Sequence, residues 1–309
     1  MCRVIFRRFE NNMKQFLILI VLVLAGCGEA ADTAKVNQQP DSAKVNQHLE
    51  TEDVFAQLTN RIVIFKEQGK LLNNLKLITD QQAEIIVDAY QTKHVHWDAN
   101  FNPLGLPLNG LSSITNNQAE TLGEVRYNPE KDEFCTLYLN GLKSINEEQA
   151  KGLSKAENLE LNGLTSITDQ QAKSLSRVEG YLHLNGLTTI TDQQAESLSK
   201  VGYLFLDGLT SITEKQAEFL GSSSWLELNG LTSITDAQAE SLSRVEGYLH
   251  LNGLTSITDP QAESLRKAGS LSLHGLTSIT DAQAESLSKA DWGTVSEAFF
   301  PLINRYKKP

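Results

Sequence analysis

The stretch YLHLNGLTTITDQQAESLSK, residues 181–200, is the most regular copy of a unit that recurs along most of the chain. The glycine of its NGL triplet sets the register of the other copies, and after one spacing of 31 residues the glycines recur every 22 or 23 residues. These glycines are Gly110, Gly141, Gly163, Gly186, Gly208, Gly230, Gly253 and Gly275. A weaker first copy begins at Asn73, which gives about nine units over residues 73–290. Such a period is typical of a solenoid, in which small units stack and share one core.

Each unit predicts one short strand, one turn and one short helix. Leu182 and Leu184 alternate with Tyr181 and His183, so the leucines face the core while their neighbours face outward. A threonine and a glutamine three residues apart then form the capping box that begins a helix, and Asn146 replaces the threonine in one unit. One unit buries too little apolar surface to fold alone, so neighbouring units must supply the rest. The shared core is predicted to contain the row Leu161, Leu184, Leu206, Leu228, Leu251 and Leu273.

The pattern LxLxGLTSITDxQAESL resembles the units of leucine-rich-repeat proteins over about residues 70–290. The resemblance implies an α/β solenoid with one parallel sheet and one short helix per repeat. In that family an asparagine or cysteine ladder follows the strand, and leucine stands at this place here, so we expect the hydrogen bonding of the turn to differ. The leucines concerned are Leu164, Leu187, Leu209, Leu231, Leu254 and Leu276.

The N-terminal part indicates export. Residues 16–25 read FLILIVLVLA, ten apolar residues where a membrane-spanning helix needs about 20, which is typical of a signal peptide. The sequence LAGC at residues 24–27 resembles the lipobox of bacterial lipoproteins, and Met13 is a plausible true start. The resemblance implies that Cys27 is lipidated and begins the mature chain. In lipoproteins resembling those of enterobacteria, an aspartate after the cysteine goes with inner-membrane retention, so the resemblance implies that Gly28 favours the outer membrane or the cell surface.

These patterns predict five segments. Residues 1–26 form the signal peptide, and residues 27–49 form the lipidated cysteine and a flexible tether, because their small polar side chains bury little apolar surface. Residues 50–72 have apolar positions at helical spacing and predict an N-terminal capping helix. The solenoid follows over residues 73–290. Residues 291–309 are rich in aromatic residues and predict a C-terminal cap.

Composition and motifs narrow the function. Lys and Arg number 27 against 38 for Asp and Glu, and this net charge of −11 argues against a general nucleic-acid binder. The sequence lacks a GxSxG elbow, a phosphate loop, HExxH and CxxC, so we expect no enzyme, no cofactor and no metal. Asp207 and Glu227 on neighbouring strands leave carbohydrate cleavage as a remote alternative.

Two further motifs have structural rather than chemical interpretations. His94 and His96 share one face if their segment is a strand, but two ligands are too few for a typical metal site, and a polar loop around Trp97 is the favoured interpretation. Cys135 is the cysteine that remains after Cys2 and Cys27 are accounted for. It has no base in its motif, so we expect it to be buried and structural.

The outward strand positions predict three parallel rows. The first holds Thr136, Asn158, Tyr181, Tyr203, Trp225, Tyr248 and Ser270, and the second holds Tyr138, Glu160, His183, Phe205, Glu227, His250 and Ser272. The third holds Asn140, Asn162, Asn185, Asp207, Asn229, Asn252 and His274, and we expect turn geometry to explain it because Asn and Gly tolerate a positive φ.

The first two rows contain the candidate binding surface. Its residues are Tyr181, His183, Tyr203, Phe205, Trp225, Glu227, Tyr248 and His250. Exposed aromatic rings beside charged groups favour noncovalent binding of a protein or glycan in the cell envelope. Two alternatives stay open: the rings pack on one another, or the solenoid is a structural spacer or surface-coat element without a dedicated ligand.

Overall fold

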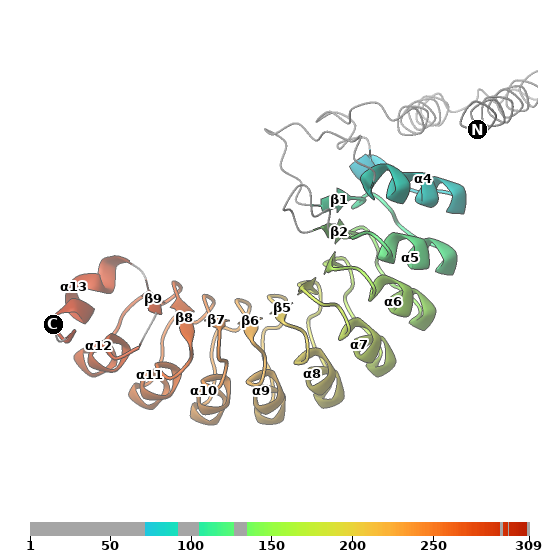
Figure 1. Ribbon diagram of the computed structural model, residues 1–309. Coiled ribbons are helices and arrows are strands. Elements are labelled where there is room, and N and C mark those ends of the chain that lie inside the picture. Colours follow the sequence, from blue (N-terminus) through green and yellow to red (C-terminus); the bar gives the residue numbers. More distant parts are fainter. Residues whose placement is uncertain (1–71, 92–104, 127–134, 291–292, 296, 308–309) are drawn as a thin grey trace, which may run out of the picture. The chain divides into compact units, whose positions relative to one another are not determined.

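The computed structural model describes residues 72–91, 105–126, 135–290, 293–295 and 297–307. Within these residues, strands and helices alternate, and nine parallel strands form one sheet in the order of the sequence (Figure 1). The strands are β1 (Gly105–Pro107), β2 (Thr136–Tyr138), β3 (Asn158–Glu160), β4 (Tyr181–His183), β5 (Tyr203–Phe205), β6 (Trp225–Glu227), β7 (Tyr248–His250), β8 (Ser270–Leu273) and β9 (Gly293–Val295).

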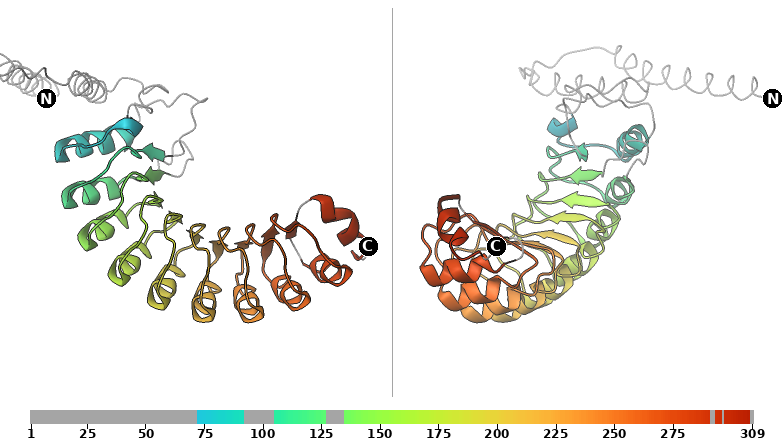
Figure 2. Two further views of the ribbon diagram at one scale, coloured as in Figure 1. Left: turned by 180° about the vertical axis from the view of Figure 1, so that it is seen from behind. Right: turned by 60° about the vertical axis from the view of Figure 1, so that its left-hand side comes forward.

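The helix α4 precedes β1, and one further helix follows each strand from β1 to β8. The helices are α4 (Asp80–Gln91), α5 (Asn116–Gly123), α6 (Glu147–Leu153), α7 (Asp169–Leu175), α8 (Asp192–Leu198), α9 (Glu214–Leu220), α10 (Asp236–Leu242), α11 (Asp259–Leu265) and α12 (Asp281–Ser288), with η1 (Glu297–Phe299) and α13 (Phe300–Asn304) after β9. The strands line one side of the stack and α5–α12 line the other, as the views in Figures 1 and 2 agree. The predicted fold class is confirmed for the described residues, which form a leucine-rich-repeat-like α/β solenoid with one parallel sheet and one short helix per repeat.

Equivalent residues of successive units lie side by side. Leu182 pairs with Leu204 and Tyr203 pairs with Trp225, so the three predicted rows run across the strands. The strand leucines Leu182, Leu184 and their counterparts are fully buried, and the leucine after each NG pair is buried as well. Each such side chain contributes roughly 1.5–3 kcal/mol by leaving water. The predicted core row therefore forms one continuous core.

The capping boxes do more than start the helices. In α8, the Thr191 hydroxyl accepts from the backbone N–H of Gln194, and the Gln194 Oε1 accepts from the backbone N–H of Thr191. The same reciprocal pair is present in every unit from Thr79 to Gln283, with Asn146 in its predicted place. The sequence pattern did not reveal that the Gln194 Nε2 also donates, at 2.9 Å, to the Ile167 carbonyl of the preceding unit. The capping glutamines from Gln118 to Gln283 thus also tie their units to the preceding ones.

An asparagine ladder runs through the structure at the third-row positions, where turn geometry had been the expected explanation. The side-chain Oδ1 of each third-row residue from Asn140 to Asn252 accepts from the backbone N–H of the next third-row residue, the last of which is His274, and Asn73 and Asn109 extend the ladder in the same way toward the N-terminus, at 2.8–3.2 Å throughout. The ladder residue precedes the glycine, whereas the leucine after the glycine is buried in the core, so the hydrogen bonding follows a different position of the unit. These bonds satisfy backbone donors that would otherwise be lost at the end of each strand.

The glycines of the NGL triplets also have a different cause from the one expected. None of them has a positive φ. A Cβ at Gly186 would lie 2.2 Å from the Asn162 carbonyl oxygen and 2.5 Å from that of Leu164, so the backbones of neighbouring turns approach too closely for any side chain. Close approach of two backbones, rather than turn conformation, requires glycine here.

At the C-terminal end, Val295 and Ile303 are buried, and Phe299, Leu302 and Tyr306 pack against the core, whereas Phe300 is exposed. The predicted signal peptide, Cys27, the tether and the N-terminal capping helix lie outside the described residues, apart from Leu72. His94, His96 and Trp292 lie outside them too. Among the helices that the structure describes, none is long and apolar enough to cross a membrane.

Candidate binding surface

The first two rows form what we call the strand face, the outward side of β3–β8 from Asn158 to Ser272. Leucines between the row residues anchor each strand from behind, because side chains alternate across a strand. All eight candidate residues are described, and the strand pairing brings them together on this face. The solenoid therefore converts residues far apart in sequence into one contiguous surface.

The first row is a ladder of aromatic rings. The ring centroids of Tyr181 and Tyr203 are 4.5 Å apart, those of Tyr203 and Trp225 are 5.4 Å apart, and those of Trp225 and Tyr248 are 4.1 Å apart. The rings do pack on one another, which was one of the two alternatives that the sequence left open. Yet Tyr203 is 37% exposed and Tyr248 is 46% exposed, so packing holds the rings in place without burying them. An ordered, exposed aromatic row loses little side-chain entropy on binding.

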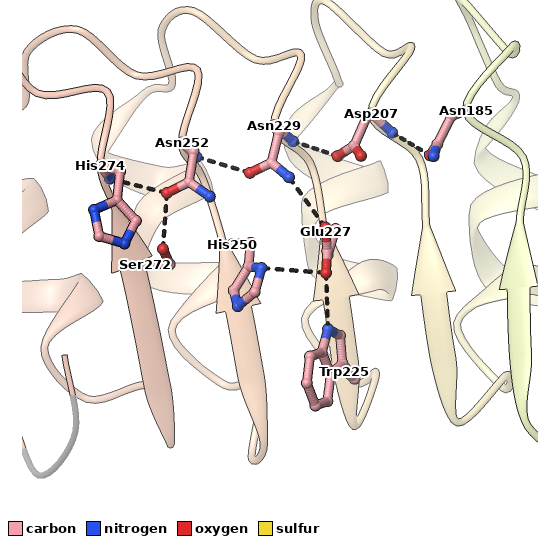
Figure 3. A network of polar contacts seen from close by, with 9 residues as sticks. All are labelled: Asn185, Asp207, Trp225, Glu227, Asn229, His250, Asn252, Ser272 and His274. Atoms are coloured by element: carbon pink, nitrogen blue, oxygen red, sulfur yellow. Dashed lines mark hydrogen bonds and ion pairs between the residues drawn. The ribbon is translucent and has the colours of Figure 1, made fainter. Parts of the chain in front are cut away.

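The second row combines rings with charge. The His183 imidazole stacks on Phe205 with centroids 3.7 Å apart. Glu227 is the centre of a small network shown in Figure 3: its carboxylate accepts from the indole Nε1 of Trp225 at 3.3 Å, from the Nδ2 of Asn229 at 3.1 Å, and lies 3.2 Å from His250 Nδ1. Trp225 is thereby held by a hydrogen bond as well as by its ring neighbours.

Burial and charge act in opposite directions on the titratable groups of this face. Burial lowers the pKa of the His183 imidazole below 6.5, and the nearby carboxylates offset this in part. Burial also raises the pKa of the Asp207 carboxyl above 3.8, and the charge of Glu227 adds to that rise. Burial alone would raise the pKa of Glu227, but the hydrogen bond and charge of His250, with the bond from Trp225, leave its pKa below 4.5.

Replacing Asp207 by asparagine should stabilise the fold near neutral pH. Asp207 is the one acid among the third-row ladder residues that the structure describes, and an asparagine would keep the Oδ1 acceptor that meets the backbone N–H of Asn229. Because folding raises this pKa, the carboxylate costs stability above its folded pKa, and the gain should vanish as the pH falls below about 3.8. The group is half-exposed, so we expect at most about 1 kcal/mol, measured by urea denaturation at pH 7 and pH 3.

The predicted burial of Cys135 is confirmed, since its side chain is buried and burial raises the pKa of the thiol to about 12.

In a chain with Cys2 and Cys27 replaced by serine, we expect Cys135 to react with a disulfide reagent at pH 8 about a thousandfold more slowly when folded than in urea, because the thiolate is the reactive form. Equal rates in both conditions would contradict this assignment.

Asp207 and Glu227, the remote candidates for carbohydrate cleavage, serve as hydrogen-bond acceptors in the ladder and the Glu227 network. In the part of the chain that the structure describes, no cluster of three or more His, Cys, Asp or Glu side chains is arranged to hold a metal ion. The strand face offers stacking surface and fixed acceptors, which suit noncovalent contact.

No family model and no curated protein matches the chain. Among solved structures, the chain is similar to an internalin from Listeria monocytogenes, with 14% sequence identity over 84% of this chain and 93% of that one and a TM-score of 0.32.

Proposed function

We propose that the chain is an envelope lipoprotein whose solenoid is a noncovalent binding scaffold, and that the strand face is its contact surface. The observation that carries this proposal is the aromatic ladder, in which Tyr203 and Tyr248 stay 37% and 46% exposed while neighbouring rings hold them in place. Rigid aromatic side chains of this kind are enriched where binding energy concentrates. The lipobox resemblance at Cys27 supports attachment to a membrane, with the outer membrane or the cell surface favoured.

The contact surface can be tested by placing a photoreactive amino acid at Tyr203 or Tyr248 in the native host cell. We expect both positions to form discrete cross-linked species on irradiation, identified by mass spectrometry. The matched control is the same replacement at Glu218, an exposed position of α9 on the opposite side of the stack. Cross-links of equal yield from both sides, or from neither, would instead favour a spacer without a dedicated ligand.

The anchor is tested separately. Replacing Cys27 by serine should abolish incorporation of labelled palmitate and move the chain from the membrane fraction to the soluble fraction. A Cys135→Ser variant is the matched control, because it alters a thiol without touching the lipobox. Labelling that persists in the Cys27 variant would refute the lipoprotein assignment. The contact surface is tested independently by the cross-links at Tyr203 and Tyr248.

A further inference from the structure

Apart from the imidazoles of His183 and His250, the titratable groups of the strand face with a charge near neutral pH are carboxylates. The carboxylates concerned are Glu160 and Glu227 in the second row and Asp207 in the neighbouring third row. No lysine or arginine occurs within β1–β9. Among the described residues, none of these three carboxylates forms an ion pair with a lysine or arginine. Glu160 accepts from the amides of Asn140 and Asn162, at 2.9 and 3.4 Å, and these partners are neutral.

These carboxylates have given up part of their hydration. His250 lies 3.2 Å from Glu227 and lowers its pKa, whereas Glu160 and Asp207 have no ion-pair partner among the described residues. All three are half-buried, and burial is the largest influence on the pKa of Asp207 and of Glu227. A partly desolvated carboxylate is stabilised by an opposite charge at close range, and a bound partner can bring that charge. The face is therefore complementary to cations.

The aromatic ladder lies beside these charges at a fixed interval. Trp225 and Glu227 are two residues apart on β6, and the Glu227 carboxylate accepts a hydrogen bond from the Trp225 indole Nε1 at 3.3 Å. Arginine and lysine have an apolar stem that ends in a cation, and their charged groups also interact with aromatic rings. One such side chain can cover a ring with its stem and reach a carboxylate with its end.

We propose, on the basis of the scaffold function above, that the strand face binds a protein segment rich in arginine and lysine. The stems of these residues lie on Tyr203, Trp225 and Tyr248, and their cations pair with the carboxylates of Glu160, Asp207 and Glu227. Anionic glycans and anionic lipid headgroups are repelled by the same charges.

The test uses the purified full-length chain with Cys27 replaced by serine, and a fluorescein-labelled peptide of four Arg-Ser repeats as the probe. Fluorescence anisotropy should show saturable binding that a Glu-Ser peptide of equal length does not share. In the double variant Glu160→Gln and Glu227→Gln, affinity should fall at least tenfold. Glutamine retains an oxygen acceptor at each position, and circular dichroism checks that the variant stays folded.

Because the whole chain is acidic, the control must remove the same charge elsewhere. Glu196 and Glu218 are exposed on α8 and α9, and their double replacement by glutamine should change affinity less than twofold. A second variant, Tyr203→Leu with Tyr248→Leu, keeps the charge and removes the two most exposed rings of the ladder. We expect it to weaken binding about fivefold.

Equal losses in the two glutamine pairs would overturn the proposal, since they would show attraction to net charge alone. Binding of the Glu-Ser peptide, or no binding of the Arg-Ser peptide, would overturn it as well. The scaffold function has an independent readout in the cross-links at Tyr203 and Tyr248. If the cross-links form although one of these results is obtained, the scaffold function is still supported and only the proposed binding of a basic segment is contradicted.

Discussion

Replacing Gly186 by alanine should destabilise the solenoid by about 3 kcal/mol or more, among the largest effects of any single methyl group in this chain. The added Cβ would lie 2.2 Å from the Asn162 carbonyl oxygen, so the backbones of two neighbouring turns must separate. That separation strains the ladder bond between the Asn185 N–H and the Asn162 side chain. Because a solenoid is held by contacts between neighbours, we also expect denaturant unfolding to become biphasic, as the segments on either side uncouple.

Gly202 provides the matched control for this substitution. It lies in the next inter-element turn, and a Cβ there would have its nearest neighbour, the Glu179 carbonyl oxygen, at an ordinary 3.6 Å. Gly202→Ala should be neutral or stabilising by a few tenths of a kcal/mol, because it restricts the unfolded chain. Comparable losses in both variants would show that glycine is required here for flexibility rather than for space.

The second large effect is expected for Gln194→Glu, at roughly 2–3 kcal/mol near neutral pH. A carboxylate can still accept from the Thr191 N–H, so the cap itself survives. The oxygen that replaces Nε2, however, would face the Ile167 carbonyl oxygen, to which Nε2 donates at 2.9 Å, and two acceptors repel each other there. The loss should be largest above the folded pKa of the new acid and should disappear below about pH 4, where the acid is protonated in both states and can donate.

Gln193→Glu is the control for that variant. Gln193 is exposed in the same first turn of α8, so its replacement adds the same charge without touching another unit. A carboxylate at this helix end is mildly favourable, and we expect a change within about 0.5 kcal/mol. Thermal and urea denaturation of the two variants at pH 4 and pH 7 separates the effect of charge from the effect of the lost bond.

The features that the sequence predicted well are those in which cause and pattern lie within one unit. The alternation around Leu182 determines which side chains enter the core, and the spacing of Thr191 and Gln194 determines where the helix begins. Both are local, so one copy of the unit contains all the information needed. The register between units followed as well, because only one alignment stacks leucine on leucine.

The features that the sequence pattern predicted wrongly or did not reveal are contacts between a residue and a neighbouring unit. An Asn-Gly pair is a common local turn signal. In this chain, however, the asparagine side chain accepts from a backbone N–H of the next unit, and the glycine leaves room for the backbone of the preceding unit. The invariant choice of glutamine over glutamate in the capping boxes was the available signal for a contact between units, since a local box accepts either residue. On the strand face, spacing predicted the rows but not that Glu227 would hold the indole of Trp225.

The asparagine-ladder bonds and the bonds from the capping glutamines recur at the same positions of successive units, and this has an evolutionary consequence. If one 22-residue copy were lost by recombination, the Asn162 side chain would meet the backbone of residue 207 instead of residue 185, with the same chemistry at every join. Gene duplication or deletion can therefore lengthen or shorten the molecule by about one strand width, 4.8 Å, while both kinds of bond form again at the new junction. Natural variants of this gene are then expected to differ in copy number by whole units, and their reach across a partner would vary in discrete steps.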